Sequence, residues 1–191
     1  MQTSRMQVLK VLLLLVLVPS CQPTPSQQPE PNGVTVLENG RKLSGMTDFD
    51  ATFAGTPVSG NTVTISFSTR FDPIVNAIDD EYRLTFSLAF PDAGVLSAGS
   101  IVDLSSVTGL SGLFEVSCFC ADLPRYSAVS SGTLNIEEIS PSAIKGSLAA
   151  TFVLTDRLDR LSGNPDRTGR SYDFSIESFA ASLAKLPAPP D

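Results

Sequence analysis

Apolar and polar residues alternate along most of the chain after Gly33, a pattern typical of strands that bury one face. In residues 82–90, five large apolar residues share one face, and Arg83, Thr85 and Ser87 take the other. The same period predicts further strands at residues 34–36, 49–53, 62–68, 100–104, 113–119, 134–139, 144–154 and 172–176. We therefore expect eight or nine strands in the chain.

Turn-forming residues separate these strands, and helical patterns are scarce. Turns are predicted where Gly, Pro, Asn and Asp gather, at residues 55–57, 59–61, 91–94, 131–132 and 163–166. Asp72 followed by Pro73 could begin one short helix that runs to Ile78. The sequence thus predicts an all-β fold, an antiparallel β-sandwich or flattened barrel of about eight or nine strands. We expect it to form one domain over residues 34–186, with a disordered tail at 187–191.

The beginning of the chain has the pattern of an export signal. Arg5 and Lys10 precede an uninterrupted apolar run at residues 11–18, and residues 18–21 read Val-Pro-Ser-Cys. The run is much shorter than the roughly 20 residues that cross a bilayer, so we do not expect a transmembrane helix.

These last four residues resemble the lipobox of bacterial lipoproteins that signal peptidase II matures. The resemblance implies a signal peptide over residues 1–20, cleavage before Cys21 and covalent lipid on the Cys21 sulfur, although Pro19 departs from the residues usual at its position. Two or more acyl chains hold a protein firmly, because each buried CH₂ contributes about 0.8 kcal/mol. The alternative is an ordinary secretory signal that leaves Cys21 as a free thiol. The chain has three cysteines, so lipid on Cys21 leaves an even number, which favours the lipoprotein.

Residues 21–33 form the predicted tether between the lipid and the domain. After Cys21 the segment is rich in Pro and Gln and has no apolar face, so we expect it to stay solvated. In lipoproteins of bacteria with two membranes, an Asp after the lipidated Cys commonly retains the protein in the inner membrane, whereas Gln22 stands there in this chain. The resemblance therefore implies an exported protein in the outer rather than the inner membrane, with membrane lipid as its first partner.

Composition narrows the range of functions. Removing the signal takes away two of the 13 basic residues and none of the 20 acidic ones, so the net charge moves from −7 to −9. An acidic domain repels nucleic acid, and we expect no such partner. The chain has no His, the commonest general base and a frequent metal ligand, and no Trp.

Cys118 and Cys120 are the remaining cysteines and lie two positions apart. In an extended strand such residues share a face, with Cα atoms about 7 Å apart, the upper limit for a disulfide. A bridge needs a bent strand end, which residues 121–124 could supply, so a structural disulfide is the preferred interpretation. Two separate thiols, or a thiolate site for a metal or for redox chemistry, are the alternatives.

Two groups of oxygen-bearing side chains could bind Ca²⁺, which takes about six to eight oxygen ligands. The first group is Asp72, Asp79, Asp80 and Glu81, and the second is Asp156, Asp159, Asn164, Asp166 and Asp173. Four Arg residues accompany the second group, and neither group has the spacing of an EF-hand loop. We therefore expect solvated loops and no cofactor besides the lipid, with the first group as the candidate for Ca²⁺.

The sequence offers little for catalysis. Neither a Gly-x-Ser-x-Gly elbow nor a phosphate-binding Gly loop occurs. A glycosidase can work with two carboxylates alone, so a carboxylate-dependent glycan hydrolase stays as the minor alternative. The main prediction is a non-catalytic envelope domain with a binding or structural role, whose partner is an envelope protein or glycan. The other alternative is a Ca²⁺-dependent adhesion module.

The order of the predicted strands resembles a β-rich domain of uncharacterised bacterial lipoproteins. The segments that carry the resemblance are residues 49–55, 131–136, 144–148 with Phe152, and 172–176. They mostly encode strands and turns, and the resemblance implies no established activity.

Overall fold

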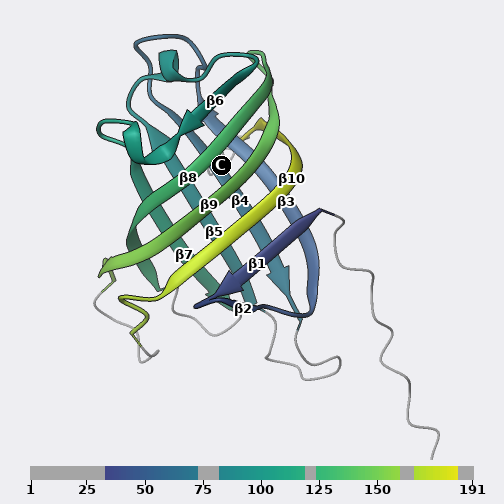
Figure 1. The fold of residues 1–191 in the computed structure, drawn as a ribbon, viewed down its shortest axis with the longest axis vertical. Helices are drawn as coiled ribbons and strands as arrows, with labels where there is room; N and C mark the ends of the chain where they lie inside the picture. The colour runs from purple at the N-terminus through teal and green to yellow at the C-terminus, as the bar shows by residue number, and fades with distance from the viewer. Residues whose placement is uncertain (1–32, 73–81, 119–123, 160–165, 185–191) are drawn as a thin grey trace, which may run out of the picture.

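The structure, a computed structural model, describes residues 33–72, 82–118, 124–159 and 166–184, which form ten strands and two short 3₁₀ turns (Figure 1). The elements are β1 (Val34–Glu38), β2 (Arg41–Lys42), β3 (Met46–Gly55), β4 (Val63–Phe71), β5 (Tyr82–Phe90), η1 (Ala93–Val95), β6 (Ser100–Asp103), η2 (Leu104–Ser106), β7 (Ser111–Cys118), β8 (Arg125–Ile139), β9 (Ala143–Arg157) and β10 (Ser171–Leu183). The predicted helix at residues 73–78 lies outside the described ranges. Within those ranges, no helix is long and apolar enough to cross a membrane.

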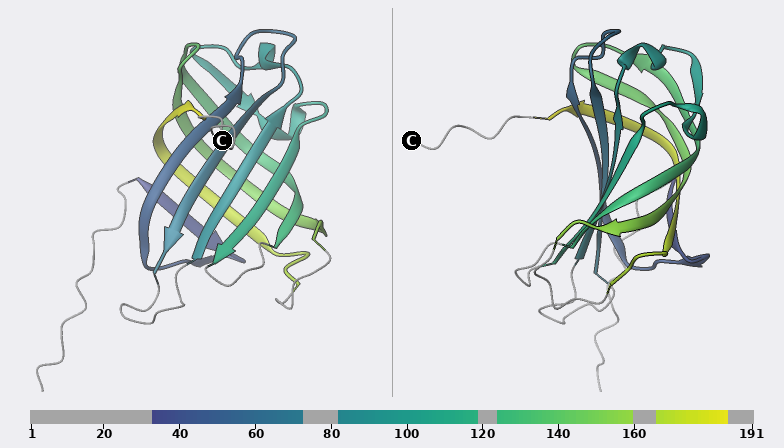
Figure 2. Two further views of the ribbon diagram at one scale, coloured as in Figure 1. Left: turned by 180° about the vertical axis from the view of Figure 1, so that it is seen from behind. Right: turned by 90° about the vertical axis from the view of Figure 1, so that its left-hand side faces the viewer.

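Seven of the strands close into a barrel, in the order β3, β4, β5, β7, β8, β9 and β10. The closing contact is short and parallel: Ser182 and Leu183 of β10 lie beside Thr52 and Phe53 of β3. The other neighbouring strands of the barrel pair antiparallel. Figure 2 shows β3, β4, β5 and β7 on one side of the molecule, with β8, β9 and β10 crossing the other.

The prediction of an all-β domain is confirmed, but the predicted sandwich or flattened barrel is not. All ten strands belong to one sheet, and the long strands β8, β9 and β10 carry it around to its other edge. Register shifts between Ile136 and Glu138, and between Ile176 and Phe179, interrupt the pairing of these strands. Such bulges bend a sheet and increase its twist, which allows it to close.

Aromatic side chains fill the inside of the barrel. The ring of Phe86 on β5 lies at the centre of this cluster, with its centroid 4.5 Å from that of Phe114, 4.8 Å from Phe152 and 3.9 Å from Phe174. Tyr172 stacks on Phe114 at 4.6 Å. These five side chains are at most 2 % exposed, and their tilted and edge-to-face arrangements are favourable for aromatic rings. This packing leaves the ends and the outer face of the barrel for contacts with other molecules.

Two short strands extend the barrel wall. β1 pairs with the first half of β10, along the edge that β3 joins only at Ser182 and Leu183. In the same way β6 pairs with the second half of β8, while β7 pairs with its first residues. β6 therefore lies on the line of β7 but beyond the end of β5, and this offset forms the candidate site.

Candidate functional site

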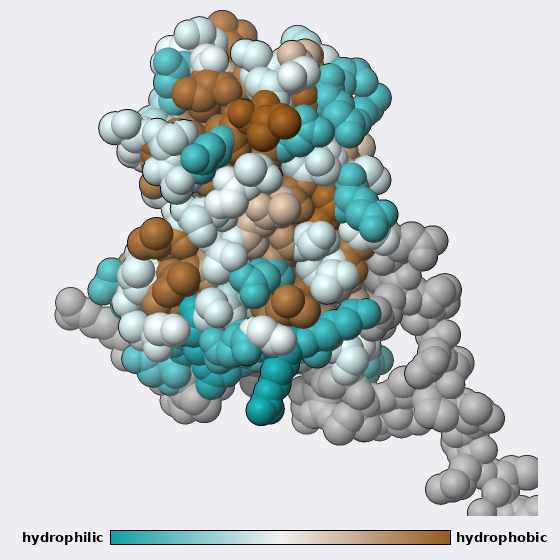
Figure 3. Space-filling view, viewed as in Figure 1, coloured by the Kyte–Doolittle hydropathy of each residue, from teal (hydrophilic) through white to brown (hydrophobic). Residues whose placement is uncertain are grey.

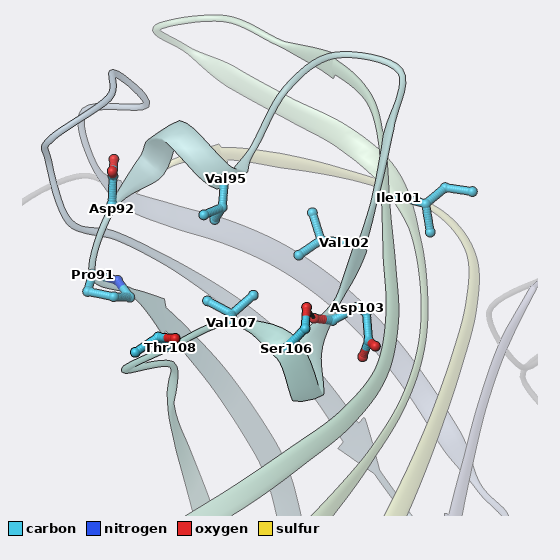
Figure 4. A pocket seen from close by; sticks show the side chains of 9 residues that line it. All are labelled: Pro91, Asp92, Val95, Ile101, Val102, Asp103, Ser106, Val107 and Thr108. Carbon is cyan, nitrogen blue, oxygen red and sulfur yellow. Dashed lines mark hydrogen bonds between the residues drawn. The ribbon is translucent and has the colours of Figure 1, made fainter.

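A cleft of about 450 Å³ lies at the end of the barrel that carries η1 and η2, the upper end in Figure 1. We call it the β6 cleft, and it is lined by Pro91, Asp92, Val95, Ile101, Val102, Asp103, Ser106, Val107 and Thr108. Figure 4 shows η1 on one side of it and β6 on the other, with η2 below. All of these residues belong to the segment between β5 and β7.

The first wall forms because β5 cannot continue. Pro91 follows the last residue of β5 and has no N–H for the ladder. Asp92 then caps η1: its Oδ1 accepts hydrogen bonds from the N–H of Gly94 and from the N–H of Gly60, both at 2.7 Å. The second bond ties η1 to the turn between β3 and β4. A Cβ at position 94 would lie 2.7 Å from Ser59 Oγ, so a larger residue there would require Ser59 to move.

The second wall is β6 and the turn that follows it. Asp103 caps η2, where its Oδ1 accepts from the N–H of Ser105 at 3.0 Å and from the Ser105 hydroxyl at 2.6 Å. Leu104, 2 % exposed, fixes η2 in the core. Local bonds thus hold the turn after β6, and β6 itself pairs with β8, which leaves its other edge beside the cleft.

Valine side chains make the apolar part of the cleft. Figure 4 shows Val95, Val102 and Val107 converging from η1, β6 and the end of η2, while Ile101 points away from them. Val95 is 40 % exposed and Ile101 is 73 % exposed. Figure 3, seen from the side of Figure 1, shows hydrophobic residues gathered over this upper end and hydrophilic residues along the lower end.

The cleft carries negative charge. Hydrogen bonds from Gly60 and Gly94 lower the pKa of the Asp92 carboxyl, and those from the Ser105 hydroxyl and N–H lower the pKa of Asp103. Both groups are therefore carboxylates at neutral pH. None of the described residues that line the cleft is Lys or Arg. Asp92 lies toward η1 and Asp103 toward η2 and the end of β6, so the two charges flank the valines (Figure 4).

The opposite, lower end of the barrel holds a polar group that we call the Glu38 cluster: Glu38, Arg167, Arg170 and Tyr172. The Tyr172 hydroxyl donates to Glu38 Oε1 at 2.7 Å, and Arg170 Nη1 donates to the same oxygen. Arg167 Nη1 donates to the Tyr172 hydroxyl at 2.8 Å. The Glu38 side chain is 20 % exposed. This cluster ties the end of β1 to the beginning of β10.

The charges of the Glu38 cluster compensate one another. Partial burial raises the pKa of Glu38, but the hydrogen bonds from Arg170 and Tyr172 and the charge of Arg167 outweigh it, so its pKa lies below the ordinary value. Burial raises the pKa of the Tyr172 hydroxyl, which stays protonated. A carboxylate that already binds two guanidinium groups and a hydroxyl is suited to holding structure together rather than to binding a ligand.

A third feature is a shallow groove of about 320 Å³ on the outer face of β1, β8, β9 and β10. It exists because Gly132 and Ala149 leave little side chain there; a Cβ at Gly132 would lie 2.2 Å from the Ala149 carbonyl oxygen. Its one carboxylate, Asp173, accepts from the Thr151 hydroxyl at 2.6 Å. The carboxylate of this groove is thus already engaged by a neighbouring hydroxyl.

Of the three cysteines, only Cys118 lies in the described part of the chain. Cys21 and Cys120 lie outside the described residues. Cys118 is the last residue of β7, opposite Tyr82 of β5. The lipid on Cys21 and the disulfide between Cys118 and Cys120 therefore stay predictions.

The predicted first Ca²⁺ group cannot be assembled either. Asp72 follows β4, and its N–H donates to the Gly45 carbonyl at 2.8 Å, whereas Asp79, Asp80 and Glu81 lie outside the described residues.

The second group is divided among local contacts. Asp159 binds Arg157, Asp166 binds Thr168, Asp173 binds Thr151, and Asn164 lies outside the described part. Among the described residues, no three His, Cys, Asp or Glu residues are placed to hold a metal ion. Ca²⁺ binding stays a prediction.

A Ser-x-x-Lys spacing, Ser142 to Lys145, occurs at the start of β9, but it forms no nucleophile and base pair. On a helix this spacing brings the two side chains together, whereas on a strand residues three apart point to opposite faces. The Lys145 ammonium instead donates to Glu138 Oε2 at the end of β8, at 2.6 Å.

Sequence reasoning recognised residues 91–94 as a turn but missed Asp92 and Asp103 as site residues. The available signal was an Asp that begins a turn on each side of a short strand, with valines close by. Comparison with protein-family models, curated proteins and solved structures finds no match to this chain. The geometry of the site is therefore the basis for its function.

Proposed function

We propose that this protein is an exported lipoprotein, held to the cell envelope through Cys21, whose barrel domain binds a partner without catalysing a reaction. The β6 cleft is the observation that carries the binding role. It combines the exposed Val95 and the half-buried Val107 with two carboxylates, and none of its described lining residues is a cation. Concave sites of this kind, mostly apolar with a few placed polar groups, are typical of ligand binding.

The electrostatics of the cleft support binding over hydrolysis. A carboxylate-dependent glycosidase needs one carboxyl with a raised pKa to protonate the leaving group. Asp92 and Asp103 both have lowered pKa values, because backbone or serine donors stabilise their charged forms. The chain also contains no His that could take the place of the acid.

The anchoring part of the proposal rests on the sequence. The Val-Pro-Ser-Cys segment at residues 18–21 follows an apolar run, and a Pro-rich segment separates Cys21 from β1. The Gln at position 22 favours the outer membrane as the location. Lipid at this point would hold the domain beside a membrane and leave the barrel in water.

Mass spectrometry of the protein from its own host tests the anchor. We expect the amino-terminal peptide to begin at Cys21 and to carry the mass of acyl chains. The Cys21→Ser variant should leave the membrane fraction, while Cys118→Ser should stay there. An unmodified Cys21 in the mature protein would contradict the anchor.

Site-specific photo-crosslinking in intact cells tests the binding role. A photoreactive residue at Val95 lies in the cleft, and the same residue at Val129, which is 62 % exposed on β8, is the matched control. We expect Val95 to give a discrete crosslinked species that Val129 does not give. Identical patterns from both positions would contradict a binding role for the β6 cleft.

A further inference from the structure

We propose that the β6 cleft binds an extended peptide segment of another protein, which adds to the free edge of β6 and presents aliphatic and cationic side chains. This inference rests on the proposed function and names the partner class of the same site. It is carried by the pairing of β6, by the position of the cleft and by the charge of its lining.

The edge of β6 is the first part of the argument. β6 has one strand partner, β8, within the described residues. Its register runs from Ser100 opposite Ile136 to Asp103 opposite Thr133. A strand with one partner leaves backbone N–H and C=O groups on its other side, and such groups are a template for a further strand. At the start of this edge the Ser100 N–H already donates to the Ser97 carbonyl at 3.1 Å, so the edge open to a partner lies at Ile101–Asp103.

The cleft lies where such a strand would go. β5 pairs with β7 through Ala89 opposite Ser111, and then Pro91 ends the strand and the chain turns into η1. Because β6 continues the line of β7 along β8, the place beside β6 that β5 would occupy is left open. At about 3.3 Å per residue, Ile101–Asp103 of β6 offer about 10 Å of edge.

The lining determines which side chains the added strand should carry. Val95 and Val107 supply apolar surface beside the edge, and Asp92 and Asp103 supply two negative charges with no Lys or Arg among the lining residues. In both carboxylates the internal hydrogen bonds go to Oδ1. A peptide that alternates aliphatic residues with Lys or Arg complements such a surface, and strand addition is an established mode of peptide recognition.

The same lining argues against a glycan in this cleft. Sugar rings are commonly bound on aromatic side chains, and none of the nine lining residues is aromatic. The aromatic rings of the described domain are largely committed to its core. A peptide is therefore the partner that we test first.

The experiment measures binding of dye-labelled hexapeptides to the full chain by fluorescence anisotropy. The probe alternates valine and lysine and has blocked ends. One comparison peptide carries glutamate in place of lysine, and another carries N-methyl groups on alternate peptide bonds, which remove hydrogen-bond donors from one edge. We expect the lysine peptide to bind and both comparison peptides to bind at least about tenfold more weakly.

Matched variants locate the site. Asp92→Asn with Asp103→Asn keeps the capping oxygens and removes both charges. Asp48→Asn with Asp50→Asn makes the same change of charge at exposed positions on β3. We expect the first pair of substitutions to weaken binding of the lysine peptide by about tenfold or more. The second pair should change its affinity less than twofold.

Four results would overturn the inference. Equal binding of the N-methylated peptide would exclude strand addition, and equal binding of the glutamate peptide would exclude charge recognition. Binding of neutral oligosaccharides without binding of the lysine peptide would assign the cleft to glycans. If the peptides do not bind while crosslinks still form at Val95, the peptide inference is wrong and the proposed binding function stands. If neither peptide binding nor crosslinking is seen, both proposals are wrong.

Discussion

β1 and β6 extend the barrel in the same way, yet their outer sides differ. The end of β1 is covered by β2, which pairs with Leu37 and Glu38, and the Glu38 cluster fixes this end. β6 has no strand on its outer side within the described residues, and its flanking carboxylates face no cation in the cleft lining. The comparison teaches that charge at the β1 end serves stability, whereas charge at the β6 end is available to a partner.

The largest expected effect is loss of the Glu38 cluster. Glu38→Ala leaves Arg167, Arg170 and the Tyr172 hydroxyl without their shared acceptor, and we expect a loss of about 2 kcal/mol in the free energy of unfolding. The matched control is Glu138→Ala, whose ion pair with Lys145 is about half exposed and should contribute about 0.5 kcal/mol or less. Urea unfolding measures both. Equal losses would remove the distinction between the two ends.

The pH dependence of stability tests the same cluster by another route. Since the pKa of Glu38 is lower in the folded protein than the value of about 4.3 for a free Glu, its contribution is full above that pH. It is lost as the pH falls through the folded pKa, because the unfolded chain takes up the proton first. Glu38→Gln removes this titration, so the unfolding free energy of the variant should fall less steeply below about pH 4.3. The urea unfolding midpoints of both proteins, measured from pH 7 to pH 3, test this expectation. Parallel curves for the two proteins would contradict it.

The sequence predicts the straight strands well and the bent ones poorly. The pattern predicts a strand at residues 82–90 with five apolar residues on one face. β5 has these bounds, and four of the five residues are buried while Tyr82 is partly exposed. β8 begins at Arg125 and β10 ends at Leu183, beyond the predicted segments. Bulges such as the one between Ile176 and Phe179 shift the alternation from one face to the other, so a strict two-residue period is lost there.

Closure of the barrel and the cleft depend on contacts that no local pattern contains. The closing pair joins Thr52–Phe53 to Ser182–Leu183, about 130 positions away in the chain, through two residue pairs. The cleft arises because β6 is offset beyond the end of β5, which follows from the register of both β6 and β7 on β8. Asp92 could be recognised as a turn residue, but its place in a cleft could not.

A smaller effect is expected from Thr69 of β4, the one buried polar residue of the core within the described ranges. Its side chain is 0 % exposed, and its hydroxyl has no hydrogen-bond partner among the described residues. Thr69→Val keeps the shape of the side chain and removes the unpaired group, so we expect a gain of about 1 kcal/mol in the free energy of unfolding. Thr85→Val is the control, because its hydroxyl lies 3.2 Å from that of Ser68 and its removal should bring no gain. A loss of stability in Thr69→Val would mean that the hydroxyl has a partner after all.

The most direct test of the comparison concerns the two outer strands, and its Ile101 variant has the smallest expected effect. Val36 of β1 is 0 % exposed, whereas Ile101 of β6 is 73 % exposed. Thr in place of Val36 buries a hydroxyl beside β2 and β10, which should cost about 2 kcal/mol of stability.

Ile101→Thr changes a side chain that already faces water and should stay within about 0.5 kcal/mol of the wild type. Thermal unfolding of the two single variants, followed by circular dichroism, gives the comparison. A similar loss at both positions would mean that the β6 side chain is covered in solution, as β1 is, and the edge would then be closed to an incoming strand. A loss of stability at Val36 alone supports the interpretation that β6 is an uncovered outer strand, whose exposed Ile101 side chain contributes little to the stability of the fold.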